Sequence, residues 1–521
     1  MALKTEVNKL LDHAVRLSKG NPRLQPLADS AKEMKTRLFE PLRVAVVGIA
    51  KAGKSTFMNA LMGDSIVDTG TTETTFTVGW FRYGETPSLK ICFRDGSTQD
   101  APFSDLSKWS VRNAARENDR LNDVKYVMIY YPSEVLRRIE FIDTPGLNSV
   151  YGTDAQNTED FLAIQGHEDT LAEASSADAV IYAFSRSLSG FDTEVLQAFH
   201  EGGTRGNSPI NSIGILTKID ATGIWGIDDY GKKTPAEAAL PVTDKLMRDP
   251  TAQEMLFAVY PVCAKPAEGI AQLNEADREV LKKAAALDPD TLADLLYDAR
   301  TFTVDEDAEF AALGPAAARK SLMGKLAQYG ILEAAGQLRA GRSLEELETV
   351  MRAGCGIDKV LNILQSHFGN RTFLIKTQFI FGHLGTVLSE LKQAFPEDRA
   401  VQNVCMQIRE EMDNLKTSVQ TLDELKVLQM YYNRQVDFQS AEELEDFLRV
   451  TGEYGRSPEE RLGMEKGCTI AQFREKAGQK AGKWRARAAD IMRDRAYVTA
   501  ARTIARSYEI MYYHLSGLIE E

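Results

Sequence analysis

The chain has 521 residues, of which 43% are hydrophobic and 26% are charged, and its formal net charge at pH 7 is −13. This length allows several domains, and the balance of apolar and charged residues is typical of a soluble globular protein. The acidic excess argues against a nucleic-acid-binding protein whose whole surface is basic, so no nucleic-acid partner is expected.

The cysteines and the apolar runs indicate the cellular compartment in which the protein is expected. The five cysteines are scattered singly, without a Cys-x-x-Cys pair, at Cys92, Cys263, Cys355, Cys405 and Cys468. This pattern favours reduced thiols in a cytosol over a disulfide framework or a zinc site. No apolar signal core follows Met1, and no run of about 18 apolar residues could span a bilayer. We therefore expect a cytoplasmic protein whose membrane contact is peripheral, at the inner face of the cell membrane.

Residues 1–41 predict two helices. Apolar side chains recur at helical spacing from Leu3 to Val15, and Gly20-Asn21-Pro22 ends this first pattern. A second pattern runs from Leu24 to Leu38, before Pro41. A helix with such an apolar stripe must bury it against another apolar surface. We expect these helices to pack with a helical bundle further along the chain; docking on the next domain is the alternative.

Residues 44–61 contain the strongest motif. A short apolar run, Val44 to Val47, predicts a buried strand, and it is followed by a glycine-bounded loop and a helical pattern. The spacing Gly48-x4-Gly53-Lys54-Ser55 is that of a P-loop, in which backbone N–H groups and a helix N-terminus surround phosphates. Lys54 then reaches the β- and γ-phosphates, and the Ser55 hydroxyl ligates Mg²⁺. The expected phosphate-binding residues are Gly48, Lys51, Ala52, Gly53, Lys54, Ser55 and Thr56. A chance glycine turn before a helix is the alternative.

A threonine-rich segment, residues 71–75, follows the P-loop helix. It can close over the γ-phosphate and place one hydroxyl on Mg²⁺, although threonines are common in loops. The runs Val78 to Tyr83 and Leu89 to Phe93 then predict a hairpin of two strands.

The run from Ile139 to Gly146 is the second strong motif. Its apolar strand delivers Asp143 to the Mg²⁺ shell, and the backbone N–H of Gly146 can sense the γ-phosphate until hydrolysis removes it. An ordinary strand and turn would fit the local residues, but would not explain their position after a P-loop.

The third motif, Ile213 to Asp220, ends in Thr217, Lys218 and Asp220. The Asp220 carboxylate can accept from N1–H and N2–H₂ of guanine, which adenine does not offer, and the Lys218 stem can lie along the base. A later strand and loop, residues 257–265, can touch the guanine O6 through backbone N–H groups; its site residues are Cys263, Ala264 and Lys265. Four motifs in this order indicate a guanine-nucleotide site for GTP or GDP with Mg²⁺.

These segments resemble a known family. Residues 48–56, 143–146, 217–220 and 263–265 look like the first, third, fourth and fifth G motifs, and residues 40–48 and 72–81 resemble the bacterial dynamin-like GTPases, particularly their actinobacterial isoniazid-inducible branch. The resemblance is clear over the GTPase (G) domain and faint in the C-terminal helices, at residues 326–330 and 484–487. It implies a GTPase with Thr75 as the switch I threonine on Mg²⁺, or Thr72 as second choice. The implied catalytic set is Lys54, Thr75, Gly146 and Lys51, and the implied metal ligands are Ser55, Thr75 and Asp143.

One position departs from the family pattern. Eukaryotic dynamins often carry a glutamine two residues after the first P-loop glycine, where it positions the attacking water; here that residue is Ala50. The neighbouring Lys51 can supply charge compensation instead. A solvated Lys51 without a catalytic role is the alternative.

From about Glu275 the chain becomes rich in Ala, Leu, Glu and Lys and predicts helices to the end. A proline-free pattern from Gly356 to Ala394 corresponds to a helix of about 57 Å at 1.5 Å per residue, which is longer than a compact domain needs. The expected fold is an α/β P-loop GTPase domain with a mostly parallel sheet plus an extended all-α helical bundle, or trunk. The expected domains are residues 1–41 packing with the bundle, 42–274 as the G domain, and 275–521 as the trunk.

The stretch from Ala471 to Arg506 is basic in an otherwise acidic chain. Against three acidic residues it holds ten basic ones: Arg474, Lys476, Lys480, Lys483, Arg485, Arg487, Arg493, Arg495, Arg502 and Arg506. A basic helix face can dock on anionic lipid. The alternatives are a solvated face or an intramolecular partner for acidic segments such as Asp305 to Glu309.

The leading hypothesis is therefore a Mg²⁺-dependent GTPase that self-associates through its G domains and binds or remodels an anionic membrane peripherally. The rival is a GTP-gated scaffold or switch for a protein partner, without membrane remodelling. A ribosome-associated GTPase is a weaker third reading, since the sequence shows no RNA-binding motif.

Overall fold

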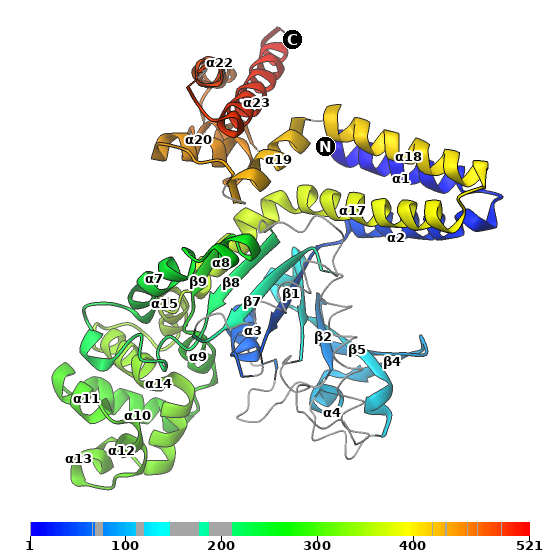
Figure 1. The fold of residues 1–521 in the computed structure, drawn as a ribbon. Helices are drawn as coiled ribbons and strands as arrows, with labels where there is room; N and C mark the ends of the chain where they lie inside the picture. Colours follow the sequence, from blue (N-terminus) through cyan, green and yellow to red (C-terminus); the bar gives the residue numbers. More distant parts are fainter. Residues whose placement is uncertain are drawn as a thin grey trace.

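The computed structural model describes residues 2–49, 51–64, 66–67, 77–110, 119–145, 177–186, 211–418, 420–432, 435–455, 457–465, 467–490 and 492–520. Within them the apolar side chains form two cores. One core surrounds a nine-stranded sheet, and the other joins helices from both ends of the chain (Figure 1).

Five neighbouring strands of the sheet are parallel, and all but the one at the edge of the sheet are almost fully buried. In spatial order they are β6 (Ile139–Asp143), β1 (Leu42–Gly48), β7 (Ala179–Phe184), β8 (Ser212–Leu216) and β9 (Ala258–Pro261). Because strands buried on both faces need no polar alternation, they read as continuous apolar runs in the sequence. Their carboxyl ends meet at one edge, where an α/β sheet binds its ligand. The expected α/β fold with a mostly parallel sheet is confirmed.

The other half of the sheet differs from the expected hairpin. Its strands are β2 (Val78–Tyr83), β3 (Ser88–Phe93), β4 (Thr98–Pro102) and β5 (Val124–Tyr131). The strand β5 lies between β2 and β3, parallel to the first and antiparallel to the second. The hairpin prediction was wrong because β5 pairs with both strands, and nothing in the short loop between β2 and β3 signals this later insertion.

The sheet core extends well beyond the β9 strand. After α7 (Pro235–Leu246), α8 (Pro250–Met255) and α9 (Ala264–Gly269), seven further helices contribute to it: α10 (Glu275–Ala286), α11 (Pro289–Leu296), α12 (Ala299–Val304), α13 (Ala308–Leu313), α14 (Ala316–Arg339), α15 (Glu346–Gly354) and α16 (Ile357–Ile363). The boundary expected at residue 274 rested on the change in composition. Because the buried apolar residues of these helices belong to the same core as those of the sheet, we propose a boundary after the π-helical segment η10 (Leu364–Gly369) instead.

The second core is entirely helical. Four of its helices form an antiparallel arm in Figure 1: α1 (Ala2–Leu17), α2 (Gln25–Phe39), α17 (Asn370–Ala394) and α18 (Arg399–Ser418). Five more form a group beside that arm: α19 (Gln420–Tyr432), α20 (Ala441–Val450), α21 (Pro458–Leu462), α22 (Ile470–Ala488) and α23 (Arg495–Glu520). The long pattern from Gly356 to Ala394 is therefore not one α-helix, since η10 interrupts it. None of the helices in the described ranges is long and apolar enough to cross a bilayer.

Two buried polar clusters join the arm to the sheet core, both through α17. In the first, Nζ of Lys376 donates to the carbonyl oxygens of Arg37 at 2.7 Å, Glu40 at 2.6 Å and Pro41 at 2.9 Å. Asp178, just before β7, accepts from the Arg37 guanidinium at 2.9 Å and lies 3.8 Å from the Lys376 ammonium. Burial lowers the pKa of Lys376 to about 8, and the charge of Asp178 opposes that shift.

The second cluster lies where η10 meets α17. Here His367 and Arg371 both contact the Glu453 carboxylate, and the His367 ring stacks on Phe257 at 4.1 Å between centroids. Burial pushes the pKa of Glu453 up, but the hydrogen bond from His367 and the charge of Arg371 hold it at about 2. These groups fix the start of the arm against Phe257, the residue immediately before β9.

Replacing Lys376 with methionine should loosen the first cluster. Three carbonyl groups, buried or half-buried, would lose their donor, at a cost of about 3 kcal/mol. Hydrogen exchange of backbone amides from the end of α2 into β1 should accelerate about 100-fold. The matched control is Lys392→Met near the other end of α17, which should leave this exchange unchanged. Equal exchange in wild type and Lys376→Met would show that the cluster does not hold the junction.

Candidate functional site

The loop between β1 and α3 (Lys54–Met62) has the geometry of a phosphate-binding loop. It starts at Gly48, where an added Cβ would lie 2.2 Å from the carbonyl oxygen of Ala183 on β7, so only glycine fits. It ends at Gly53, whose φ of 88° is in the left-handed region. The helix then begins at Lys54, with Ser55 and Thr56 in its first turn. The expected strand, loop and helix are all present.

The Lys54 side chain closes this loop. Its Nζ donates to the carbonyl oxygens of Gly48 at 2.9 Å and Ile49 at 3.1 Å, and the residue is 7% exposed. The loop thus holds a positive charge at the helix N-terminus, where an anion is stabilised by the charge and by the helix dipole together.

Asp143 lies beside Lys54 at the carboxyl end of β6, paired in register with Val46 of β1. It is 2% exposed, and its Oδ1 has no hydrogen-bond partner among the described residues. Burial raises the pKa of Asp143 to about 6, while the Lys54 charge pulls it down. A buried carboxylate oxygen without a partner suits Mg²⁺, which takes few protein oxygens and completes its shell with water and phosphate. The residues present therefore fit the expected ion, with Ser55 nearby in the α3 first turn.

Thr217 connects the base-recognition motif to the P-loop. Its hydroxyl donates to the carbonyl oxygen of Ala52 at 2.5 Å and also lies 3.1 Å from the carbonyl oxygen of Phe184, which accepts the Thr217 N–H at 2.8 Å. The sequence identified Thr217 as part of a motif, but did not predict that its side chain would hold the loop.

The residues expected to bind guanine come together around Asp220. Burial raises the pKa of Asp220, and its own backbone N–H, the Cys263 thiol and the Lys265 charge oppose that rise. The pKa of Lys218 is lowered by burial and by the nearby Lys51 charge. Lys51 and Lys218 both have left-handed backbone angles, with φ of 61° and 56°. The structure therefore places the two segments expected to bind guanine, residues 217–220 and 263–265, next to the P-loop.

Helices α15 and α16 support this end of the site, which the sequence did not suggest. The Cys263 N–H donates to the carbonyl oxygen of Cys355 at 2.9 Å. Gly356 has a φ of 80°, and a Cβ there would lie 2.5 Å from the carbonyl oxygen of Pro261. Burial raises the pKa of the Cys263 thiol, so Cys263 stays protonated beside Asp220. The only signal in the sequence was Gly356, a glycine after a helical pattern. Such a glycine indicates that a helix ends there, but it does not indicate which segment packs against it.

Several expected site residues lie outside the described residues: Ala50, Thr72, Thr75 and Gly146. Their roles in water positioning, Mg²⁺ binding and γ-phosphate sensing stay predictions.

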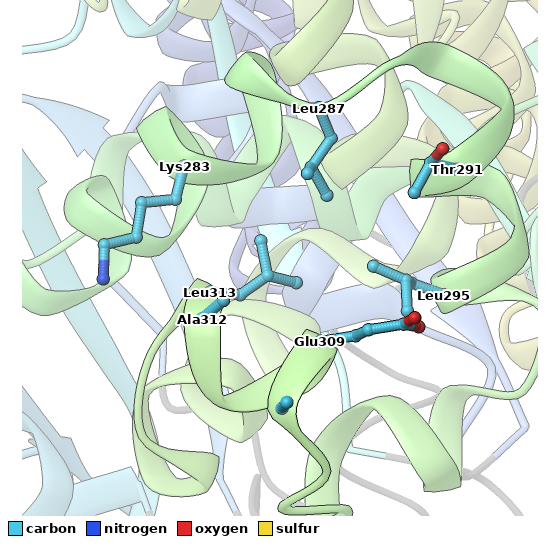
Figure 2. A pocket seen from close by; sticks show the side chains of 8 residues that line it. Lys283, Leu287, Thr291, Leu295, Glu309, Ala312 and Leu313 are labelled. Carbon is cyan, nitrogen blue, oxygen red and sulfur yellow. The ribbon is translucent and has the colours of Figure 1, made fainter.

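A separate cavity of about 430 Å³ lies among α10, α11 and α13 (Figure 2). Leu287, Leu295 and Leu313 converge on it, whereas the Lys283 ammonium points away. It belongs to the helices after β9 and contains none of the expected nucleotide-binding residues.

Comparison with known proteins agrees with this geometry. Residues 44–219 match the model of the Dynamin family. The isoniazid-induced protein IniC of Mycobacterium tuberculosis is 27% identical over 528 residues, which cover 99% of this chain and 100% of IniC. The bacterial dynamin-like protein of Nostoc punctiforme is 31% identical over 143 residues, covering 26% of this chain and 20% of that protein.

Two further matches are more limited. IniA of Mycobacterium tuberculosis is 32% identical over 149 residues, which cover 27% of this chain and 23% of IniA. A solved oligomerised bacterial dynamin pair aligns with 98% of this chain and 91% of that chain at 12% identity, but its TM-score of 0.33 is too low to compare domain arrangements. The family match over residues 44–219 and the full-length similarity to IniC bear out the expected resemblance to the bacterial dynamin-like proteins, and in particular to the isoniazid-induced ones.

Proposed function

We propose that this chain binds GTP with Mg²⁺ and hydrolyses it to GDP and phosphate, and that G-domain self-association and peripheral docking on an anionic membrane accompany turnover. The observation that carries the proposal is the meeting of Lys54, Asp143 and the Thr217–Asp220 segment at one edge of the sheet. Lys54 and Asp143 suit a phosphate chain with its ion, and Asp220 suits a guanine base.

Each residue has a distinct role in the proposed reaction. The loop from Gly48 to Ser55 binds the phosphates, and Lys54 stabilises their charge. Asp143, Ser55 and Thr75 would hold Mg²⁺, and the ion would supply further positive charge near the phosphates.

We propose that Lys51 compensates charge at the γ-phosphate; it follows Ala50, the position where eukaryotic dynamins often carry the water-positioning glutamine. Its left-handed backbone, with φ of 61°, costs energy for a residue with a Cβ, and such strain concentrates at functional sites. Its charge also lowers the pKa of Lys218, the residue expected to lie along the base.

The first test concerns the base. Asp220→Ala removes an acceptor for two guanine N–H groups and should weaken GTP binding about 100-fold, while ATP binding changes little. Titration of both nucleotides measures this preference. Asp228→Ala, on an exposed residue eight positions later, is the control and should bind as wild type does. Equal affinity of the wild type for ATP and GTP would refute the guanine assignment.

A second test separates binding from chemistry. Lys54→Ala should lose nucleotide affinity, because Lys54 offsets phosphate charge before and during the reaction. Thr75→Ala should still bind GTP but hydrolyse it at least tenfold more slowly, because switch closure acts mainly on the transition state. Single-turnover rates and nucleotide titrations give the two quantities. Normal turnover in Thr75→Ala would transfer the role to Thr72 or Thr74.

Only some of the basic residues between Ala471 and Arg506 are available for the proposed membrane contact. Six of the ten basic side chains between Ala471 and Arg506 form ion pairs with acidic side chains of the protein itself, several of them at the surface: Lys480 with Asp446, Lys483 with Glu442, Arg487 with Glu443, Arg485 and Arg506 with Glu509, and Arg493 with Asp490. Much of the basic run is thus neutralised by the protein itself. This observation favours the second candidate, a GTP-gated scaffold for a protein partner.

Four basic side chains of that stretch have no ion pair with the described residues: Arg474, Lys476, Arg495 and Arg502. Each contributes about 1 kcal/mol near an anionic surface. Reversing all four to glutamate should therefore abolish salt-sensitive pelleting with phosphatidylserine vesicles and leave basal GTP hydrolysis intact. The control reverses Lys32 and Lys282, which are exposed on other helices. A wild type that does not pellet supports the scaffold instead.

A further inference from the structure

The cavity among α10, α11 and α13 is an apolar hollow in an acidic surface. Three leucine side chains converge on it in Figure 2: Leu287, Leu295 and Leu313. Residues 287–314 contain eight acidic residues and only one basic residue. Seven of the eight carboxylates are exposed: Asp288, Asp290, Asp294, Asp298, Glu306, Asp307 and Glu309. Among the described residues only Glu306 has an ion-pair partner, Arg319 at 4.0 Å, so this surface keeps most of its negative charge.

One wall of the cavity is fixed from behind by Arg319 of α14, which is 0% exposed. Its Nε donates to the carbonyl oxygen of Gly314 at 3.0 Å, and its other two nitrogens donate to the carbonyl oxygens of Phe302 and Asp305. These bonds hold the chain on both sides of α13. A docking surface with a preformed shape loses little conformational freedom when a partner binds.

The turn between α22 and α23 has the complementary properties. Met492 in this turn is 87% exposed, the largest value for a large apolar side chain among the described residues. Asp490 holds the turn, since its carboxylate accepts from the N–H of Met492 at 3.0 Å and from Nε of Arg493 at 3.3 Å. Arg495 is exposed and has no ion pair with the described residues. The turn therefore presents an adaptable apolar side chain beside an unpaired cation.

A single chain does not bring these two surfaces together. In Figure 1, α11 and α13 lie at the lower left end of the molecule, whereas α22 and α23 lie at its top. None of the ion pairs among the described residues joins the basic stretch 471–506 to the acidic segment 305–309. The intramolecular pairing that the sequence left open is thus not observed, and the complementary surfaces remain free for contacts between copies.

We propose that the α22–α23 turn of one copy docks on the α10–α11–α13 cavity of a second copy, with Met492 among the leucines and Arg495 at Glu309. Apolar contact in a pocket supplies affinity, and opposite charges around it set the orientation. Because the two surfaces differ, the contact is head-to-tail and can add further copies. It needs no nucleotide, so it is separate from the proposed association of G domains. Arg495 also belongs to the proposed membrane contact, so a docked copy and a vesicle compete for it.

Sedimentation equilibrium of the nucleotide-free chain tests this contact. At low salt the average mass of the wild type should rise with concentration beyond that of a dimer, and high salt should return it toward the monomer. Met492→Gln, and Ala312→Gln at an exposed lining residue, should each weaken association about tenfold. The matched controls are Met406→Gln on α18, where the side chain is 50% exposed, and Ala311→Gln, on α13 but outside the lining. Both should associate as the wild type does.

Mixing the two variants tests the head-to-tail geometry. Met492→Gln keeps an intact cavity and Ala312→Gln keeps an intact turn, so an equal mixture should form dimers and nothing larger. Arg495→Glu and Glu309→Arg should each weaken association, and the double variant should recover it. A wild type that stays monomeric, or unchanged association in both Met492→Gln and Ala312→Gln, would overturn the inference. If the chain is monomeric and Met492→Gln loses vesicle pelleting, the turn contacts lipid instead of a second copy.

Discussion

The buried ammonium group of Lys54 sets the strictest condition on this fold. A cation that is 7% exposed is costly unless it has partners, and here the carbonyl oxygens of Gly48 and Ile49 and the nearby Asp143 carboxylate supply them. That arrangement needs Gly48 against β7, Gly53 in the left-handed region, and β6 in register beside β1. Phosphate oxygens can replace the two carbonyl groups as partners of the same ammonium.

The base-recognition segment contacts this loop from the end of β8, which lies on the opposite side of β7 from β1. The Thr217 hydroxyl binds the carbonyl oxygen of Ala52, and the turn at Cys355 supports Cys263 from behind. The guanine end of the site is thereby connected to α16, η10 and α17, which lead directly into the helical arm. The two buried clusters around Lys376 and Glu453 join that arm to the sheet core. Movement of the arm would therefore have to break these buried polar contacts.

The sequence was sufficient to predict features that depend on residues close together in the chain. The P-loop, Asp143 and Asp220 each follow a buried parallel strand, and such strands give continuous apolar runs and a common carboxyl edge. What depends on distant partners was missed. The pairing of β2 with β5 depends on a strand about 40 residues later, and the π-helical interruption at η10 coincides with buried contacts of His367 to Glu453. Likewise, the sequence of α22 shows its basic residues but not the acidic face of α20 that pairs with three of them.

We propose a GTPase whose turnover is coupled to self-association and to membranes. The most direct measurement is the initial rate of hydrolysis by the full wild-type chain at several protein concentrations, with GTP or ATP, and with or without phosphatidylserine vesicles. We expect Mg²⁺-dependent hydrolysis of GTP and not of ATP, with a rate per molecule that rises with protein concentration and again with vesicles. Absence of GTP turnover, or equal turnover of ATP, would contradict the claim; a constant rate per molecule would contradict the coupling.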